Sequence, residues 1–114
     1  YNSKKSLIDS AKDYVHRNYR SVDLGLDDTC KELGVSNSYF SSLFKKETGS
    51  SFVEYLTDYR MDKAARMLVE TDDKSYVIAQ NVGYADPNYF SYVFKRKYGV
   101  SPSRYRTEYE KNKV

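Results

Sequence analysis

The sequence of 114 residues predicts an all-α fold of about seven helices, in which two helix-turn-helix subdomains are joined by a long central helix. Three observations predict it: apolar residues recur at three- and four-residue spacing, helix-capping residues recur along the chain, and one pattern of residues occurs twice. We expect a first subdomain over residues 1–50, a linking helix over residues 51–70 and a second subdomain over residues 71–114.

The repeated pattern recurs at an offset of 50 residues. Its members are Tyr39 and Tyr89, Phe40 and Phe90, Ser41 and Ser91, Phe44 and Phe94, Lys45 and Lys95, and Gly49 and Gly99. Each copy is preceded, at an offset of 49 residues, by a small residue that is followed four positions later by glycine, as in Cys30 and Gly34 or Ala79 and Gly83. A short polar link and an aromatic amphipathic helix come next, which is the sequence shape of a helix-turn-helix. Two copies are too few for a solenoid and indicate tandem subdomains.

Three helices are expected in the first subdomain. Residues 4–19 carry apolar side chains at three-four spacing, which predicts an amphipathic helix. Residues 26–33 form the next helix, because two aspartates in its first turn suit the positive helix N-terminus. Ser36 is then expected to cap a third helix that runs to Thr48.

The linking helix begins with a capping box formed by Ser51 and Glu54, and its apolar positions continue to about Val69. A short helix is expected over residues 75–82. The Asp86-Pro87 pair starts the helix that ends at Gly99, because aspartate caps well and proline suits the first helical position.

A last helix is expected to start by the same device at Ser101-Pro102.

Composition excludes several classes of function. With one Cys and one His, the chain cannot form an internal disulfide, and any triad chemistry would depend on His16 alone. No Gly-rich phosphate loop, metal-ligand cluster or nucleophile elbow occurs, so we expect neither an enzyme nor a cofactor nor a bound metal. No stretch approaches the roughly 18 apolar residues of a membrane span, so no membrane partner is expected. The Cys and His counts suit the reducing cytoplasm, with Cys30 as a buried structural thiol.

Positive charge gathers near the C-terminal end. Residues 86–114 carry a net charge of +4, whereas residues 1–85 carry −1. A basic end suggests an anionic partner, and the second helix of a helix-turn-helix fits a DNA major groove, which is about 12 Å wide. The linking helix would be about 28 Å long, and successive major grooves on one face of a duplex lie about 34 Å apart. The sequence therefore predicts double-stranded DNA binding by two recognition helices in successive major grooves.

The outward faces of the two recognition helices supply the candidate contacts, because the phenylalanine stripes must face the core. Candidate base contacts, chosen because Asn bonds adenine, Ser suits either base type and Tyr offers an apolar ring, are Ser38, Ser41, Ser42, Asn88, Ser91 and Tyr92. Candidate phosphate contacts are Tyr39, Lys45, Lys46, Tyr89, Lys95, Arg96 and Lys97.

Together these motifs resemble the DNA-binding domain of AraC/XylS-type transcriptional regulators, a homeodomain-like fold. The matching positions are residues 38–40, 44–49, 60–61, 67–68, 78–79, 82–84, 89–91, 94–95 and 101–102, with Ala64, Gly99, Tyr105 and Arg106. The likeness covers about residues 7–106. It implies binding to promoter DNA through both units and contact with RNA polymerase.

The Tyr-rich first helix and the Tyr39-Phe40 pair are most similar to the YesN-type branch of this family. That likeness implies a two-component response regulator, with a receiver domain upstream in the full-length chain. A small-molecule sensor domain upstream is the alternative. A helical protein-interaction module, whose basic face meets an acidic partner, is the competing class of function.

The sequence departs from the family at several positions. Many relatives carry arginine where Ser42 and Tyr92 stand, which implies weaker or A·T-leaning base recognition here. Ser75 replaces a usual buried aliphatic residue, so we expect it to cap its helix while Tyr76 or Val77 fills the gap.

Overall fold

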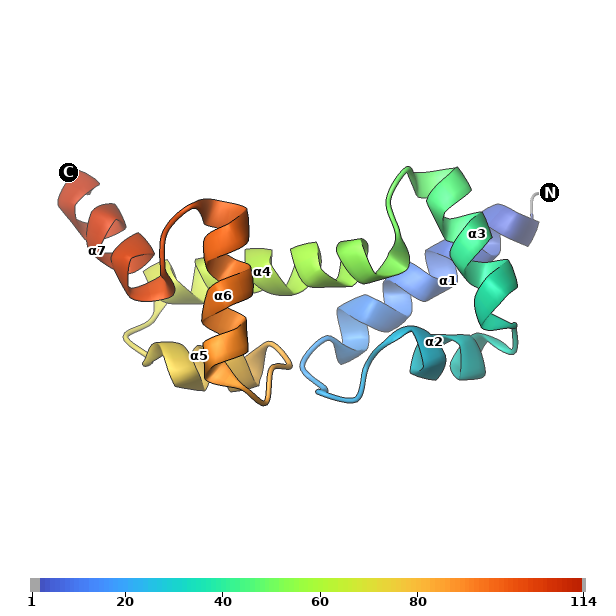
Figure 1. The fold of residues 1–114 in the computed structure, drawn as a ribbon, viewed down its shortest axis with the longest axis horizontal. Helices are drawn as coiled ribbons and strands as arrows, with labels where there is room; N and C mark the ends of the chain where they lie inside the picture. Colours follow the sequence, from blue (N-terminus) through green and yellow to red (C-terminus); the bar gives the residue numbers. More distant parts are fainter. Residues whose placement is uncertain (1–2, 114) are drawn as a thin grey trace. The chain divides into compact units, whose positions relative to one another are not determined.

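The computed structural model describes residues 3–113, which contain seven helices and no strand (Figure 1). The helices are α1 Ser3–Asn18, α2 Leu26–Leu33, α3 Asn37–Thr48, α4 Phe52–Glu70, α5 Ser75–Asn81, α6 Pro87–Tyr98 and α7 Pro102–Asn112. The predicted all-α fold is confirmed, and the helix bounds differ from those expected by one residue at most.

The chain divides into two compact units, and the division falls inside α4. Unit 1 extends to Asp58 and holds α1, α2, α3 and the first part of α4. Unit 2 begins at Tyr59 and holds the remainder of α4 with α5, α6 and α7. Each unit contains one helix-turn-helix and has its own core.

The core of unit 1 is aromatic. Phe40 and Phe44 of α3 are fully buried, as the periodicity predicts, and both pack edge-on against Phe52 of α4. Aliphatic side chains on one stripe of α1 also belong to this core: Ile8, Ala11 and Val15. Apolar burial on this stripe is what orders the amphipathic α1.

Unit 2 repeats that arrangement. Phe90 and Phe94 of α6 are fully buried, and Phe94 meets the ring of Tyr105 of α7 edge-on at 5.4 Å between centroids. The other buried apolar side chains of this unit are Met61, Ala64, Ala65, Leu68, Ile78, Ala79 and Val82. Both units therefore bury a pair of phenylalanines from the second helix of their helix-turn-helix.

Capping explains where α3, α4 and α7 begin. Ser36 accepts a hydrogen bond from the Tyr39 amide, which confirms the expected cap of α3. Ser51 and Glu54 exchange hydrogen bonds at 3.0 and 3.1 Å, the reciprocal pattern of a capping box. At the start of α7, the Ser101 hydroxyl accepts a hydrogen bond from the amide of Arg104.

The Asp86 carboxylate accepts a hydrogen bond from the amide of Asn88, which confirms the expected start of α6. Both recognition helices end at a glycine with positive φ, +86° at Gly49 and +81° at Gly99. A residue with a Cβ would be strained there, so these glycines fix where the helices stop.

The expected cap at Ser75 is wrong. Lys74 occupies the N-cap position of α5 with no side-chain cap hydrogen bond, and Ser75 is the first helical residue. Tyr76 is 55% exposed and does not fill the gap, while Val77 is half-buried.

Cys30 is buried, as expected of a structural thiol. Burial, with help from the charge of Asp27, raises the pKa of this thiol, so the unreactive protonated form is favoured. Over residues 3–113, no helix is long and apolar enough to cross a membrane.

Candidate nucleic-acid interface

The outer face of α3 presents a polar surface opposite the buried phenylalanines. Ser38 and Ser42 are exposed, Tyr39 is 49% exposed, and Ser41 lies half-buried at the edge of the core. In the last turn of the same helix, the side chains of Lys45 and Lys46 are exposed. Serine hydroxyls at the centre of the face and two ammonium groups at its end suit base and phosphate contacts, respectively.

Four of the candidate residues on α3 line one shallow hollow. Ser38, Tyr39 and Ser42 share it with Lys46, and Lys4 of α1 forms its other side. Lys4 was not among the sequence-predicted contacts, because only the packing of α1 on α3 brings it there. A second lysine beside this hollow adds positive charge at the edge of the candidate reading surface.

The aspartates of α2 hold the helix-turn-helix of unit 1 in place. The hydroxyl of Tyr14 in α1 donates a hydrogen bond of 2.8 Å to the Asp28 carboxylate, and this bond raises the pKa of Tyr14. The side-chain amide of Asn37, at the start of α3, donates to Asp27. Both aspartates are therefore structural partners, and residues 3–113 hold no group of acidic, His or Cys side chains that suits a metal.

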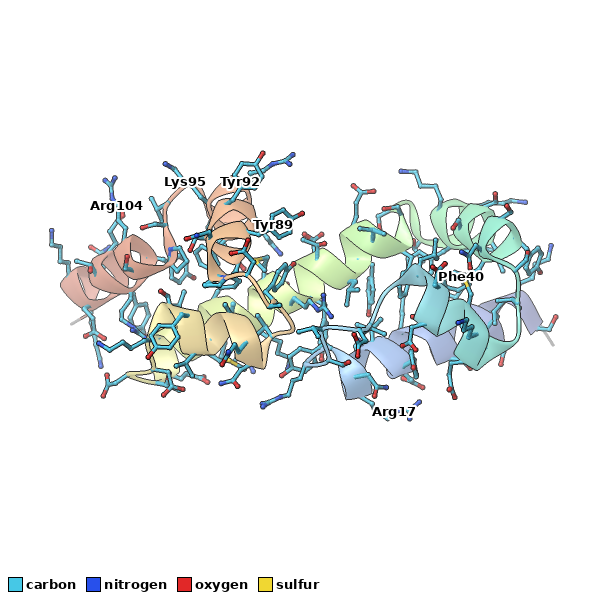
Figure 2. The ribbon with its side chains drawn as sticks, turned by 60° about the horizontal axis from the view of Figure 1, so that its bottom comes forward. Arg17, Phe40, Tyr89, Tyr92, Lys95 and Arg104 are labelled. Carbon is cyan, nitrogen blue, oxygen red and sulfur yellow. The ribbon has the colours of Figure 1, made fainter. Side chains whose placement is uncertain are left out.

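The outer face of α6 repeats the pattern with larger side chains. Asn88, Tyr89 and Tyr92 are exposed, and Ser91 is half-buried like its counterpart in α3. Figure 2 shows Tyr89, Tyr92 and Lys95 projecting from the same side of α6. Base and phosphate candidates thus share one exposed surface on this helix as well.

The three basic residues at the end of α6 have different surroundings. Lys95 and Arg96 are exposed, and the Arg96 guanidinium lies 5.8 Å from the centroid of the Tyr92 ring. Lys97 instead forms an ion pair of 2.7 Å with Asp62 of α4, and the Tyr98 hydroxyl donates to the same carboxylate oxygen. The positive charge that Lys97 offers a phosphate is therefore partly neutralised by Asp62.

The Asp62 carboxylate is adapted to its two donors. Burial alone would raise its pKa, but the hydrogen bonds from Lys97 and Tyr98 and the charge of Lys97 outweigh burial, and the net pKa is lowered. The ionised form is thus the one that ties α6 to α4 within unit 2.

Arg104 of α7 is a further basic side chain that sequence reasoning missed. It is 70% exposed, lies 3.7 Å from Glu108, and points to the same side of unit 2 as Lys95 in Figure 2. A basic residue in the first turn after a recognition helix was the available signal. The equivalent residue in unit 1 is the acidic Glu54, so the repeat itself does not reveal it.

The chain is similar to a known domain family, to curated proteins and to solved structures. Residues 29–108 match a family model described as a helix-turn-helix domain. The lactose operon transcription activator of Staphylococcus xylosus is 36% identical over 80 residues, which is 70% of this chain and 28% of that protein. The chain thus spans little more than a quarter of this curated relative.

Two solved structures are similar over most of the chain. The C-terminal domain of the two-component response regulator yesN from Fusobacterium nucleatum has a TM-score of 0.85 at 36% identity, covering 92% of this chain and 99% of that one. The C-terminal domain of AraT, a response regulator from Geobacillus stearothermophilus, has a TM-score of 0.88 at 39% identity, covering 90% and 84%.

Proposed function

Because the chain belongs to the AraC-type family of helix-turn-helix DNA-binding domains, we propose that it binds promoter DNA sequence-specifically, with α3 and α6 as its two recognition helices. The family consists of domains of transcription regulators and not of enzymes. One observation supports the two-helix proposal above others. Equivalent faces of α3 and α6 both expose polar and basic side chains while their phenylalanine stripes are fully buried.

Each recognition helix divides its residues between two roles. In the base-reading role we place Ser38, Ser41, Ser42, Asn88, Ser91 and Tyr92. In the phosphate-contacting role we place Tyr39, Lys45, Lys46, Tyr89, Lys95, Arg96 and Lys97, the last of which also pairs with Asp62. The linking helix α4 has 19 residues, about 28 Å at 1.5 Å per residue, and we propose that it sets the spacing for successive major grooves.

We further propose that the chain is the output domain of a two-component response regulator that acts in the cytoplasm and contacts RNA polymerase. The two response-regulator domains at 36% and 39% identity support this origin. An upstream small-molecule sensor is the alternative, since other regulators with this domain are also similar. The protein sequence encoded upstream of Tyr1 decides between them. A receiver domain with a phosphorylatable aspartate would support the response-regulator origin, and an upstream sequence without a receiver domain would contradict it.

The DNA-binding proposal is tested by selecting duplexes from a random pool and titrating the best one against salt. Binding should weaken with a log-log slope of about −0.9 for each neutralised phosphate, and the selected duplex should outcompete a scrambled one. Sequence-blind binding, or none, contradicts the proposal. A helical module that binds acidic proteins would show no binding to any duplex.

Two substitutions separate the roles of base and phosphate contacts. Asn88→Ala should change the preferred base at one position, at a cost of about 1–3 kcal/mol. Lys95→Ala should weaken all sequences alike and reduce the salt slope by about one. Lys111→Ala, at an exposed lysine in the last turn of α7, is the matched control and should leave base preference unchanged. Equal, sequence-blind losses for Asn88→Ala and Lys95→Ala would mean that the faces are misassigned.

A further inference from the structure

Three aromatic side chains form a continuous row in unit 2, which we call the tyrosine row: Tyr84, Tyr89 and Tyr92. The ring centroids are 6.1 Å apart between Tyr84 and Tyr89, and 6.3 Å apart between Tyr89 and Tyr92. Tyr89 and Tyr92 are stacked with an interplanar angle of 29° and are 56% and 58% exposed. The row therefore carries apolar ring surface from the edge of the core to the open face of α6, where Figure 2 shows Tyr89 and Tyr92.

The row is held at both of its ends. Tyr84 packs on the buried ring of Phe90 at 5.7 Å, and the guanidinium of Arg60, a residue only 7% exposed, lies 5.5 Å from the Tyr84 ring. At the outer end, Arg96 lies over the ring of Tyr92. Cation–π contacts of this kind orient the rings before any ligand arrives. Binding then costs little side-chain entropy, since tyrosine has few rotatable bonds to fix.

Folding of the helix-turn-helix does not require the exposed ring of Tyr92. Unit 1 buries the equivalent phenylalanine pair, yet it has Ser42 where unit 2 has Tyr92, and Val35 where unit 2 has Tyr84. Tyr39 is its one aromatic counterpart to the row. The exposed ring of Tyr92, stacked on Tyr89, therefore indicates contact with a ligand rather than a packing need.

The surroundings of the row identify the chemistry of that ligand. Lys95 and Arg96 flank it with positive charge, which fits a polyanion better than an apolar protein surface. In the major groove of DNA, the one apolar group on a base edge is the C5-methyl of thymine. Asn88 on the same face suits adenine, the pairing partner of thymine.

We propose that the tyrosine row makes α6 a thymine reader, with the ring of Tyr92, supported by Tyr89, packing on thymine C5-methyl groups. This inference rests on the DNA-binding function proposed above. Arg96, aligned along Tyr92, contacts a neighbouring phosphate. The half-site read by unit 2 is thus rich in thymine, whereas the serines of α3 impose no such methyl requirement on the half-site of unit 1.

The test uses the 114-residue chain and a duplex selected from a random pool, in which each thymine in turn is replaced by deoxyuridine. This replacement removes only the methyl group and keeps every hydrogen-bonding atom of the base edge. At the thymines read by Tyr92, affinity should fall about fourfold for each methyl, the value expected for one buried methyl group. Equal affinity for thymine and deoxyuridine at every position overturns the inference.

Three variants assign the effect to the ring of Tyr92. Tyr92→Phe keeps the ring and should keep the preference for thymine over deoxyuridine, whereas Tyr92→Ser should bind both duplexes equally. Tyr76→Ser, at an equally exposed tyrosine of α5, is the matched control and should behave as the unaltered chain does. Loss of the preference in Tyr92→Phe would assign it to the hydroxyl and overturn ring packing.

The failure of the underlying function gives a different result. A chain that shows no salt-dependent binding to any selected duplex overturns both the DNA-binding proposal and the thymine inference. A chain that binds in a salt-dependent, sequence-specific way without any methyl dependence overturns the thymine inference alone.

Discussion

At the scale of single residues, Thr29 of α2 departs from the usual chemistry of a core. It is fully buried, and its hydroxyl has no hydrogen-bond partner among the described residues. The equivalent position in unit 2 is the aliphatic Ile78, which is also fully buried. A buried hydroxyl without a partner keeps the desolvation cost of a polar group and gains nothing in return.

Thr29→Val should therefore increase the free energy of unfolding by about 1 kcal/mol, because it replaces the hydroxyl with a methyl of similar size. The measurement is the urea midpoint at an unchanged m value. Thr48→Val is the control with the opposite sign. The Thr48 hydroxyl donates to the Phe44 carbonyl at 2.8 Å and accepts from the Ser50 amide, so its loss should destabilise the chain. A destabilised Thr29→Val would show that the hydroxyl is satisfied in solution.

Sequence patterns predict which residues face inward better than they predict which charges are engaged. Three-four periodicity is enough to assign Phe40 and Phe94 to the core, because burial of large apolar rings dominates helix packing. The pairing of Lys97 with Asp62 depends on how α6 packs on α4, which no local pattern encodes. The same reason explains why Lys4 was missed.

At the scale of helices, the contact between α4 and α6 makes part of the stability of unit 2 dependent on pH. The pKa of Asp62 is lower in the folded chain than its ordinary value of 3.8, because the donors on α6 favour the ionised form. Its contribution to stability is therefore complete above that ordinary value and is lost as pH falls through the lower folded-state pKa.

Asp62→Asn should reduce the free energy of unfolding at about pH 7 by no more than about 1 kcal/mol, since the pair lies at the surface. The difference should shrink as pH falls below 3.8 and should vanish once pH lies below the lowered folded-state pKa, because the carboxyl is then neutral in both the folded and the unfolded chain. Urea unfolding at several pH values measures the difference. A difference that does not change with pH would contradict a role for the ionised carboxylate.

Helix boundaries were predictable where a side chain performs the capping. Ser36, Ser51, Asp86 and Ser101 each accept the amide hydrogen bond that their position in the sequence predicts. The expected cap at Ser75 is wrong, because the N-cap residue of α5 is Lys74, which makes no side-chain cap hydrogen bond. Capping chemistry is local and readable, but a helix that starts without it leaves no such signal.

At the scale of the whole molecule, the length of the linking helix was predictable, and its use remains a prediction. The 19 residues of α4 agree with the capping box and the apolar positions that follow it. Simultaneous docking of both recognition helices in successive grooves depends on the placement of the two units on DNA, for which a sequence pattern gives only a length.

Insertion of two alanines after Asp58, inside α4, tests that use directly. Two residues turn the following part of a helix by about 200°, so α3 and α6 should no longer reach their half-sites together. Affinity for the selected duplex should fall about a hundredfold or more. When only one recognition helix can bind its half-site at a time, the high effective concentration of the second helix at its own half-site is lost. The same insertion after Asn112, at the end of α7, is the control, and thermal unfolding checks that both variants fold.

Unchanged affinity for the same duplex after the Asp58 insertion would show that one recognition helix carries the binding alone.

Tyr55, at the start of α4, lies against Phe44, and Tyr105, fifty residues later in α7, lies against Phe94 in the same manner. Each copy of the repeat is thus closed by the helix that follows it. The first copy uses the beginning of the linking helix α4 for this purpose, and the second copy uses α7. α7 therefore covers the core of unit 2, and removing residues from Pro102 onward would expose the ring of Phe94 to water.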